Sequence, residues 1–166
     1  LVALEANVRG TDNLLGAVAT SGLAPRILIP GSALIYRPSD RAIQEDDPLG
    51  PVSPYGLSKL AQEMLAQQYA EENLELLMTR SFTHIGPGQS VSYAASSFAN
   101  QIARIEAQLT PPVIRVGSLD ARRDLTDVRD TVKAYISLMD NGTSGRPYNV
   151  CSGRAHRIGD ILDGLI

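Results

Sequence analysis

A tyrosine and a lysine four residues apart are the pair in this chain best suited to acid–base chemistry. Tyr55 and Lys59 stand at the start of a helical pattern, directly after a proline-rich segment. Residues at this spacing lie on one face of a helix, one turn from each other. A tyrosine titrates near pH ~10, but a nearby ammonium and a helix N-terminus both favour the phenolate and lower its pKa. The pair could therefore exchange a proton with an alcohol or a carbonyl group.

Ser32 adds a third polar group to this pair. It follows the short apolar run over 26–29, and α/β proteins bind ligands at the carboxyl ends of their strands. Taken alone, Ser32 fits an ordinary turn serine, and a Tyr–Lys pair at this spacing also fits a surface helix. Taken together, the three side chains could hold one substrate oxygen while that oxygen gains or loses a proton.

These residues need a sheet and helices to position them. The patterns predict strands over 26–29, 74–79, 113–116 and 148–150, and helices over 1–20, 55–72, 95–108, 128–140 and from 158 onward. We expect loops over 37–54, which holds four prolines, and over 83–93. Buried strands that alternate with helices predict an α/β fold with a parallel sheet.

Composition excludes several classes of protein. The 166 residues are 43% hydrophobic and 20% charged, and their net charge of −3 gives no attraction to nucleic acid or to an anionic membrane. The single cysteine, Cys151, excludes an internal disulfide framework and a multi-cysteine metal site, and we expect no metal. We expect Cys151 to be a small buried residue and the protein to be cytoplasmic. No apolar run approaches the ~20 residues that span a bilayer.

Six segments, in order along the chain, resemble the extended short-chain dehydrogenase family of nucleotide-sugar epimerases, dehydratases and reductases. They are Asn7–Leu15, Gly31–Tyr36, Ser53–Lys59, Arg80–Gln89, Arg123–Asp130 and Tyr148–Gly153. Ser53–Lys59 is similar to the family's catalytic helix start, and Gly31–Tyr36 to its serine-containing strand end. Each segment alone is a weak signal, but their shared order identifies the chain as a member of the family.

The resemblance implies a Rossmann-like, doubly wound parallel sheet. No glycine-rich dinucleotide fingerprint opens a strand–helix unit in this sequence, so we expect the fold to be incomplete at the N-terminus and also at the C-terminus. Residues 1–85 would form the C-terminal part of the dinucleotide-binding domain with the catalytic helix. Residues 86–166 would form mostly the substrate-binding region, interleaved with the last Rossmann elements.

The resemblance also implies the role of each catalytic residue. Tyr55 would protonate the C4 oxygen of a sugar as hydride arrives from the nicotinamide. Lys59 would hold the nicotinamide ribose and lower the tyrosine pKa, and Ser32 would hydrogen-bond the same C4 oxygen. The cofactor would be NADP or NAD, since the residue that reads the ribose 2′ position is not in this sequence.

Further contacts follow from the same resemblance. Asn7, Phe82 and His84 would lie near the cofactor, although a buried asparagine, a core phenylalanine and a structural histidine are the alternatives. Arg123 would pair with the nucleotide diphosphate, which suits a forked guanidinium. Thr83 stands where the family carries an asparagine that touches the sugar nucleotide; it keeps a hydroxyl but loses the amide.

The residues after Ser32 narrow the reaction. The family's 4,6-dehydratases carry acids where this chain has Ala33 and Leu34, which leaves reduction or epimerisation. Three segments, His84–Ser90, Arg123–Asp130 and Asn149–Gly153, resemble most the reductases of GDP-4-keto-6-deoxy-D-mannose. We therefore expect a reductase of the C4 keto group of a GDP-4-keto-6-deoxy-hexose that gives GDP-rhamnose. A nucleotide-sugar 4-epimerase is one alternative, and a non-catalytic remnant that only dimerises or binds a nucleotide is another.

The resemblance also implies a homodimer, which in this family usually forms through the helices that correspond to residues 1–20 and 55–72.

Overall fold

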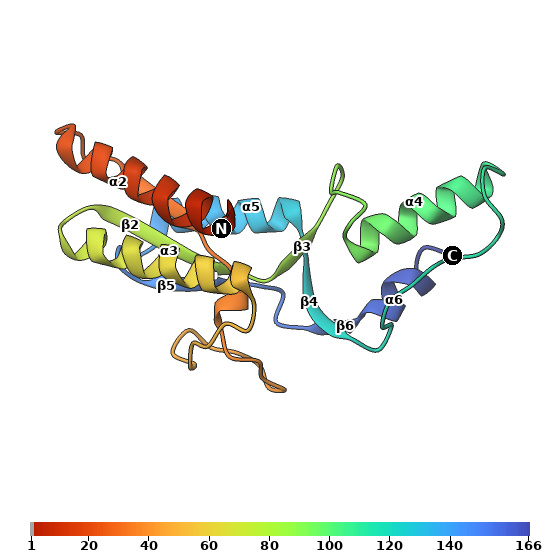
Figure 1. The fold of residues 1–166 in the computed structure, drawn as a ribbon. Helices are drawn as coiled ribbons and strands as arrows, with labels where there is room; N and C mark the ends of the chain where they lie inside the picture. The colour runs from red at the N-terminus through yellow and green to blue at the C-terminus, as the bar shows by residue number, and fades with distance from the viewer. Residues whose placement is uncertain (1) are drawn as a thin grey trace. The chain divides into compact units, whose positions relative to one another are not determined.

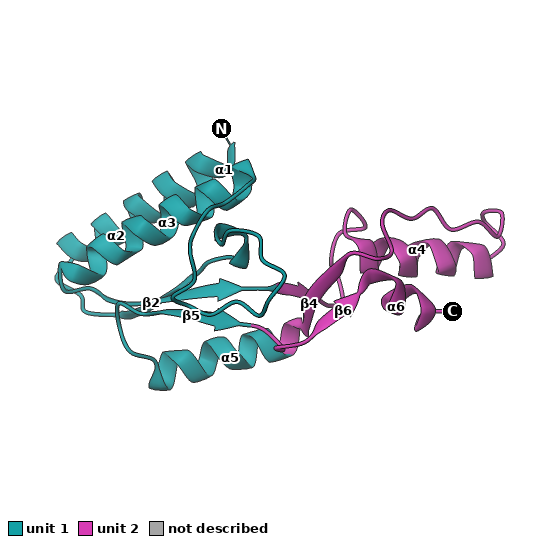
Figure 2. Cartoon of the chain, turned by 90° about the horizontal axis from the view of Figure 1, so that it is seen from below, with its two compact units in different colours: residues 1–82, 130–150 teal, residues 83–129, 151–166 magenta. Residues whose placement is uncertain are grey.

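The chain forms two compact units in the computed structural model, which describes residues 2–166. Unit 1 comprises Leu1–Phe82 and Asp130–Val150, and unit 2 comprises Thr83–Arg129 and Cys151–Ile166 (Figure 2). Leu1, the first residue of the helix predicted over 1–20, lies outside the described residues. The predicted division into a dinucleotide-binding part over 1–85 and a substrate-binding part over 86–166 concerns what each part binds, and it stays a prediction.

Unit 1 is built on a parallel three-stranded sheet in the order β1-β2-β5. The strands are β1 (Arg26–Pro30), β2 (Glu75–Ser81) and β5 (Pro147–Val150). In the central strand β2, every residue after Glu75 is buried, as is typical of a parallel strand covered on both faces. The predicted α/β fold with a parallel sheet is therefore confirmed.

Helices cover both faces of this sheet. α2 (Gly10–Thr20) and α3 (Pro54–Glu71) lie on one face, and α5 (Val128–Asn141) lies on the other (Figure 2). The core between the sheet and the first pair of helices consists of Leu15, Ile29, Ala66, Leu76 and Met78. On the opposite face, the hydroxyl groups of Ser81 and Tyr135 lie 2.6 Å apart, which ties α5 to β2.

The helix predicted over 1–20 begins with an irregular turn. α1 (Val2–Leu4) continues into a π-helical turn, η1 (Glu5–Arg9), before α2 begins. In this turn the N–H of Gly10 donates to the carbonyl oxygen of Glu5, five residues earlier. The turn therefore holds one residue more than a regular α-helical turn would.

A buried arginine fixes the long loop that connects β1 to α3. Arg80 of β2 is 5% exposed, and its guanidinium donates to both carboxylate oxygens of Glu63 on α3. It also donates to the hydroxyl of Tyr36 at 2.8 Å and to the carbonyl oxygen of Glu45 at 2.7 Å. Burial raises the pKa of Tyr36, so its hydroxyl stays protonated and donates to Asn149 of β5. Residues 37–53, which contain no helix or strand, are thus attached to the sheet and to α3.

Unit 2 holds a second three-stranded sheet, in the order β3-β4-β6. β3 (Thr83–Ile85) pairs in parallel with β4 (Arg122–Asp127), and β4 pairs antiparallel with β6 (Ala155–Arg157). The helices of this unit are α4 (Ala94–Glu106) and α6 (Ile158–Asp163), shown in Figure 1.

The prediction of a loop over 83–93 is wrong at its first three residues, which form β3. β4 and β6 escape the sequence patterns because they carry mostly polar residues.

The strand predicted over 113–116 is wrong. The segment contains no strand, and at Arg115 a side chain of α4 binds both backbone groups in place of a neighbouring strand. The amide of Gln101 donates to the carbonyl oxygen of Arg115 at 3.1 Å and accepts from its N–H at 2.8 Å.

The prediction that Cys151 is buried is also wrong. This cysteine is exposed, because it lies in the bend after β5 ends at Val150.

Among the described residues, no helix combines the length and the hydropathy that crossing a bilayer requires.

We expect Arg80→Met to lower the free energy of unfolding by about 3–5 kcal/mol, because it leaves the buried Glu63 carboxylate without its counter-ion. Urea unfolding followed by circular dichroism measures the loss. Arg9→Met is the control, since it removes only the exposed ion pair with Glu5 and should cost less than about 1 kcal/mol. Equal losses in the two variants would show that the Arg80 cluster is not a structural centre.

Candidate active site

Ser32, Tyr55 and Lys59 all belong to unit 1, where the carboxyl end of β1 lies beside the first turns of α3. The Nζ atom of Lys59 lies 2.9 Å from the carbonyl oxygen of Pro30, the last residue of β1. Ser32 follows Pro30 by two residues and is buried. The structure therefore brings the lysine and the serine, which the sequence places far apart, to one end of β1.

Local sequence explains why a turn and a helix begin at these positions. The Oγ atom of Ser32 accepts from the N–H of Leu34 and so caps a 3-10 turn, η2 (Ala33–Ile35). Ser53 caps α3 in the same way, through the N–H of Gly56 at 3.0 Å, and Pro54 occupies the first turn of the helix. Tyr55 is thereby fixed in the first turn of α3.

Gly56 allows the first turn of α3 to approach the serine turn closely. A Cβ atom at this position would lie 2.4 Å from the carbonyl oxygen of Leu34, which is too close for any side chain. Leu34 belongs to the 3-10 turn that Ser32 caps. The glycine between Tyr55 and Lys59 thus sets the separation between the helix and Ser32.

Lys59 is partly buried and held by two oxygen atoms. Besides the carbonyl oxygen of Pro30, its ammonium donates to Oε1 of Gln62 at 2.7 Å. Burial lowers the pKa of Lys59 because the partly desolvated site disfavours the charged ammonium. A narrow crevice between the amine and the sheet is lined by Ile29, Gly31, Lys59, Gln62, Glu63, Met78 and Thr79.

Asn7 contacts α3 through a serine. Its side-chain amide donates to Oγ of Ser58 at 3.0 Å, and Ser58 donates to the carbonyl oxygen of Tyr55 at 2.7 Å. Ser58 is fully buried, whereas the Tyr55 side chain is exposed. Asn7 therefore supports the backbone beneath Tyr55, and its predicted contact with a cofactor stays a prediction.

The other expected residues lie at the end of β2 and in unit 2. Phe82 is half-buried in unit 1, and its N–H donates to the carbonyl oxygen of Val150 at 2.9 Å. Thr83 and His84 are exposed on β3, and Arg123 is exposed on the neighbouring strand β4, opposite His156 of β6. The expected residues thus form two groups, one around α3 in unit 1 and one on the β3–β4 pair in unit 2.

Sequence reasoning missed the polar residues on the buried face of α3. The apolar pattern of residues 55–72 includes Leu57 and Met64, yet these side chains are 52% and 65% exposed. The buried positions are instead Gly56, Ser58, Gln62 and Ala66. Ser58, Gln62 and Ala66 recur every four positions, and this repeat was the signal that the sequence offered. Gln62 follows Lys59 by three positions, so the two side chains are neighbours on the helix.

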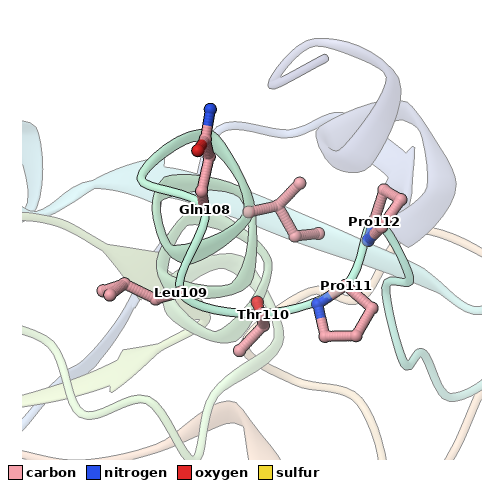
Figure 3. Close-up of a pocket in the computed structure, with 6 residues that line it drawn as sticks. Gln108, Leu109, Thr110, Pro111 and Pro112 are labelled. Carbon is pink, nitrogen blue, oxygen red and sulfur yellow. The ribbon is translucent and has the colours of Figure 1, made fainter.

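The described residues contain no group of three or more histidine, cysteine, aspartate or glutamate side chains that could hold a metal ion. A hollow in unit 2 follows the end of α4, where Leu109, Thr110, Pro111 and Pro112 curve around it (Figure 3). None of the expected site residues lines this hollow.

Comparisons with known proteins agree in pointing to one family. Residues 1–151 match the model of the NAD dependent epimerase/dehydratase family. The chain is 39% identical over 166 residues to GDP-6-deoxy-D-mannose reductase of Pseudomonas aeruginosa, covering 98% of this chain and 55% of that protein. It is 30% identical to the low-salt glycan biosynthesis protein Agl12 of Haloferax volcanii, covering 90% of this chain and 47% of the relative.

Solved structures show the same fold. The structure of RMD from Pseudomonas aeruginosa complexed with NADPH matches at a TM-score of 0.92 and 38% identity, over 96% of this chain and 55% of that one. A putative epimerase from Burkholderia cenocepacia matches at 0.86 and 34% identity, over 98% and 52% of the two chains. The chain thus spans about half the length of the relatives it matches, and its fold is the Rossmann-like one that they share.

We expect Gly56→Ala to lower the free energy of unfolding by about 1–3 kcal/mol, because the added methyl group forces α3 away from the Leu34 carbonyl. Urea unfolding measures the change. Gly10→Ala is the matched control: its Cβ meets no atom within 4 Å, and it should raise stability by roughly 0.5–1 kcal/mol. A stabilising Gly56→Ala would contradict the close approach described above.

We expect Lys59 to become reactive toward amine reagents at a lower pH than Lys133, the other lysine of the chain. Only the neutral amine reacts, and burial, by lowering the pKa of Lys59, yields the neutral form at lower pH. Lys133 is exposed and pairs with Asp130 at 2.9 Å. Reductive methylation across a pH series, quantified by peptide mass spectrometry, gives both midpoints; a Lys59 midpoint at or above that of Lys133 would refute this expectation.

Proposed function

The chain belongs to the NAD dependent epimerase/dehydratase family, and we propose on this basis that it is an NAD(P)-dependent oxidoreductase acting on a nucleotide-linked sugar. The observation that carries the proposal is that the end of β1 adjoins the first turns of α3: Lys59 donates to the carbonyl oxygen of Pro30, and Gly56 packs against Leu34 in the turn that Ser32 caps. A hydroxyl, a phenol and an ammonium at one strand end form a set suited to proton transfer at a carbonyl oxygen.

The residues of unit 1 fit a nicotinamide cofactor. Lys59 has three N–H donors, of which the oxygens of Pro30 and Gln62 take two. The third can bind a ribose hydroxyl, and the exposed ring of Tyr55 lies one helical turn away. Asn7, Phe82 and His84 are proposed as further cofactor contacts. When bound, NADPH or NADH supplies the hydride.

Tyr55 and Ser32 act on the sugar oxygen in this proposal. The Oγ of Ser32 accepts the Leu34 N–H, so its own hydrogen can be donated to the C4 oxygen. Tyr55 gives its proton to the same oxygen as the keto group becomes an alcohol. The phenolate that remains is stabilised by the Lys59 ammonium and by the N-terminal end of α3. Both interactions would favour transfer of the proton to the sugar oxygen.

The proposed substrate is a GDP-4-keto-6-deoxy-hexose, and the proposed product is GDP-rhamnose. The similarity to GDP-6-deoxy-D-mannose reductase supports this choice. So does the sequence after Ser32, where Ala33 and Leu34 offer no acid for dehydration. Thr83 and Arg123, exposed on β3 and β4 of unit 2, are proposed to bind the sugar nucleotide, with the guanidinium of Arg123 on the diphosphate.

A 4-epimerase is the second candidate, favoured by the similarity to the putative epimerase from Burkholderia cenocepacia. An epimerase returns the hydride that it removes and consumes no reductant, whereas a reductase consumes one NADPH per turnover. Absorbance at 340 nm during turnover therefore separates the two. Binding of NADPH without any turnover would instead favour the non-catalytic alternative.

We also propose that the chain forms a homodimer through α2 and α3. Leu14 on α2 and Leu57 and Met64 on α3 are large apolar side chains that remain exposed in the isolated chain. A second copy could cover them by pairing the same two helices.

A cytoplasmic location is proposed from the single cysteine, because disulfide-free chains suit a reducing compartment.

We expect Tyr55→Phe in the full-length chain to lower kcat for NADPH-dependent reduction of GDP-4-keto-6-deoxy-mannose by at least about 100-fold, because it removes the general acid. Its affinity for NADPH should change little, since the ring and Lys59 remain. Tyr69→Phe is the control on the same helix; it loses only the exposed hydrogen bond to Asp12 and should keep its activity. Full activity of Tyr55→Phe would eliminate the proposed role of the tyrosine.

A further inference from the structure

Two uncharged acceptors hold the ammonium of Lys59. One is the backbone carbonyl oxygen of Pro30 at 2.9 Å, and the other is Oε1 of Gln62 at 2.7 Å, one turn further along α3. The carboxylate lining the same crevice belongs to Glu63, which is already paired with Arg80 at 2.6 Å. The direction of the amine therefore depends on a backbone group and on the amide of Gln62.

The ammonium and Thr11 together orient that amide. An ammonium only donates hydrogen bonds, so Oε1 faces Lys59, and Nε2 of Gln62 donates to Oγ1 of Thr11 on α2 at 2.7 Å. The two side chains are only 8% and 7% exposed. The reverse orientation would place an NH2 group against the ammonium, which would leave that NH2 group without an acceptor and the ammonium with the Pro30 carbonyl oxygen alone, a costly arrangement in a buried position.

We propose that Gln62, oriented by Thr11, is a positioning residue for Lys59: together with the Pro30 carbonyl oxygen it takes two of the three N–H groups and directs the third toward the cofactor ribose. The ribose as target rests on the proposed function. The hold of Gln62 on the amine does not, since it follows from the contacts within unit 1.

A positioning role differs from a purely structural one in its effect on the amine. A buried glutamine that only joined α2 to α3 would stabilise the fold without affecting the charge on Lys59. An acceptor at 2.7 Å instead stabilises the ammonium against the desolvation that lowers the pKa of Lys59. Removing the acceptor should lower that pKa further, and replacing it by a carboxylate should raise it.

The test compares Gln62→Met, which keeps the shape and loses the acceptor, with Gln62→Glu, which keeps the acceptor and adds charge. Lys59 methylation is followed across a pH series, and Lys133 in the same chain is the internal reference. We expect the Lys59 midpoint to fall by about one pH unit in Gln62→Met and to rise in Gln62→Glu, with Lys133 unchanged. Gln67→Met is the matched control on α3, because Gln67 contacts Glu71 and not the amine.

NADPH affinity, measured by fluorescence titration of the full-length chain, tests the direction of the third N–H. We expect a roughly tenfold weaker Kd in Gln62→Met and near-normal binding in Gln62→Glu. An unchanged Lys59 midpoint in folded Gln62→Met would overturn the positioning role. If wild-type protein binds no NADPH, the proposed cofactor and the ribose target both fail, while the methylation midpoints still decide whether Gln62 holds the amine.

Thr11→Val keeps the test decisive if Gln62→Met does not fold. It removes the partner of Nε2 and leaves Gln62 in place, so the amide can rotate away from Lys59. We expect a smaller shift of the Lys59 midpoint in the same direction as in Gln62→Met. A midpoint equal to the wild-type value would mean that Thr11 does not orient the glutamine, and it would overturn that part of the proposal.

Discussion

The ion pair between Arg80 and Glu63 connects every part of unit 1 that the candidate site needs. Arg80 stands on the central strand β2, Glu63 on α3, and the guanidinium also binds the backbone of the loop that joins β1 to α3. A buried ion pair contributes stability only when its remaining donors are satisfied, and here Tyr36 and the Glu45 carbonyl take those donors. The position of Tyr55 therefore depends on a charge that lies in the core, away from the reacting groups.

The sequence predicted the parts of the fold whose residues carry their own local signal. Ser53 and Pro54 mark the start of α3, and the apolar runs mark β1 and β2, because capping and burial act within a few residues. β4 and β6 lack such a signal, since their polar residues form strands only when they meet each other. Residues 113–116 show the converse: an apolar run is not a strand when Gln101 supplies its hydrogen bonds.

The candidate site was predictable to a similar extent. Tyr55 and Lys59 were found because their spacing has chemical meaning on any helix, and Ser32 because it follows a strand. Gln62 was missed because helical patterning assigns the buried face to large apolar residues, whereas α3 buries small and polar ones. Burying small and polar residues has two effects: it lets α3 form hydrogen bonds with Thr11 of α2 and with Asn7 of η1, and it turns Leu57 and Met64 outward.

The π-helical turn at Glu5–Arg9 has a consequence for how this chain can change during evolution. The turn contains one extra residue, and a deletion there would restore a regular helix without breaking it. A π-helical turn takes up its extra residue within the one wider turn, so side chains outside it, such as that of Thr11, would keep their directions after the deletion. Asn7 lies inside the turn, and the deletion would move its side chain away from Ser58. Substitutions in this turn are therefore more tolerable than a change of its length, and homologous enzymes with a shortened turn should have lost the asparagine's support for the tyrosine backbone.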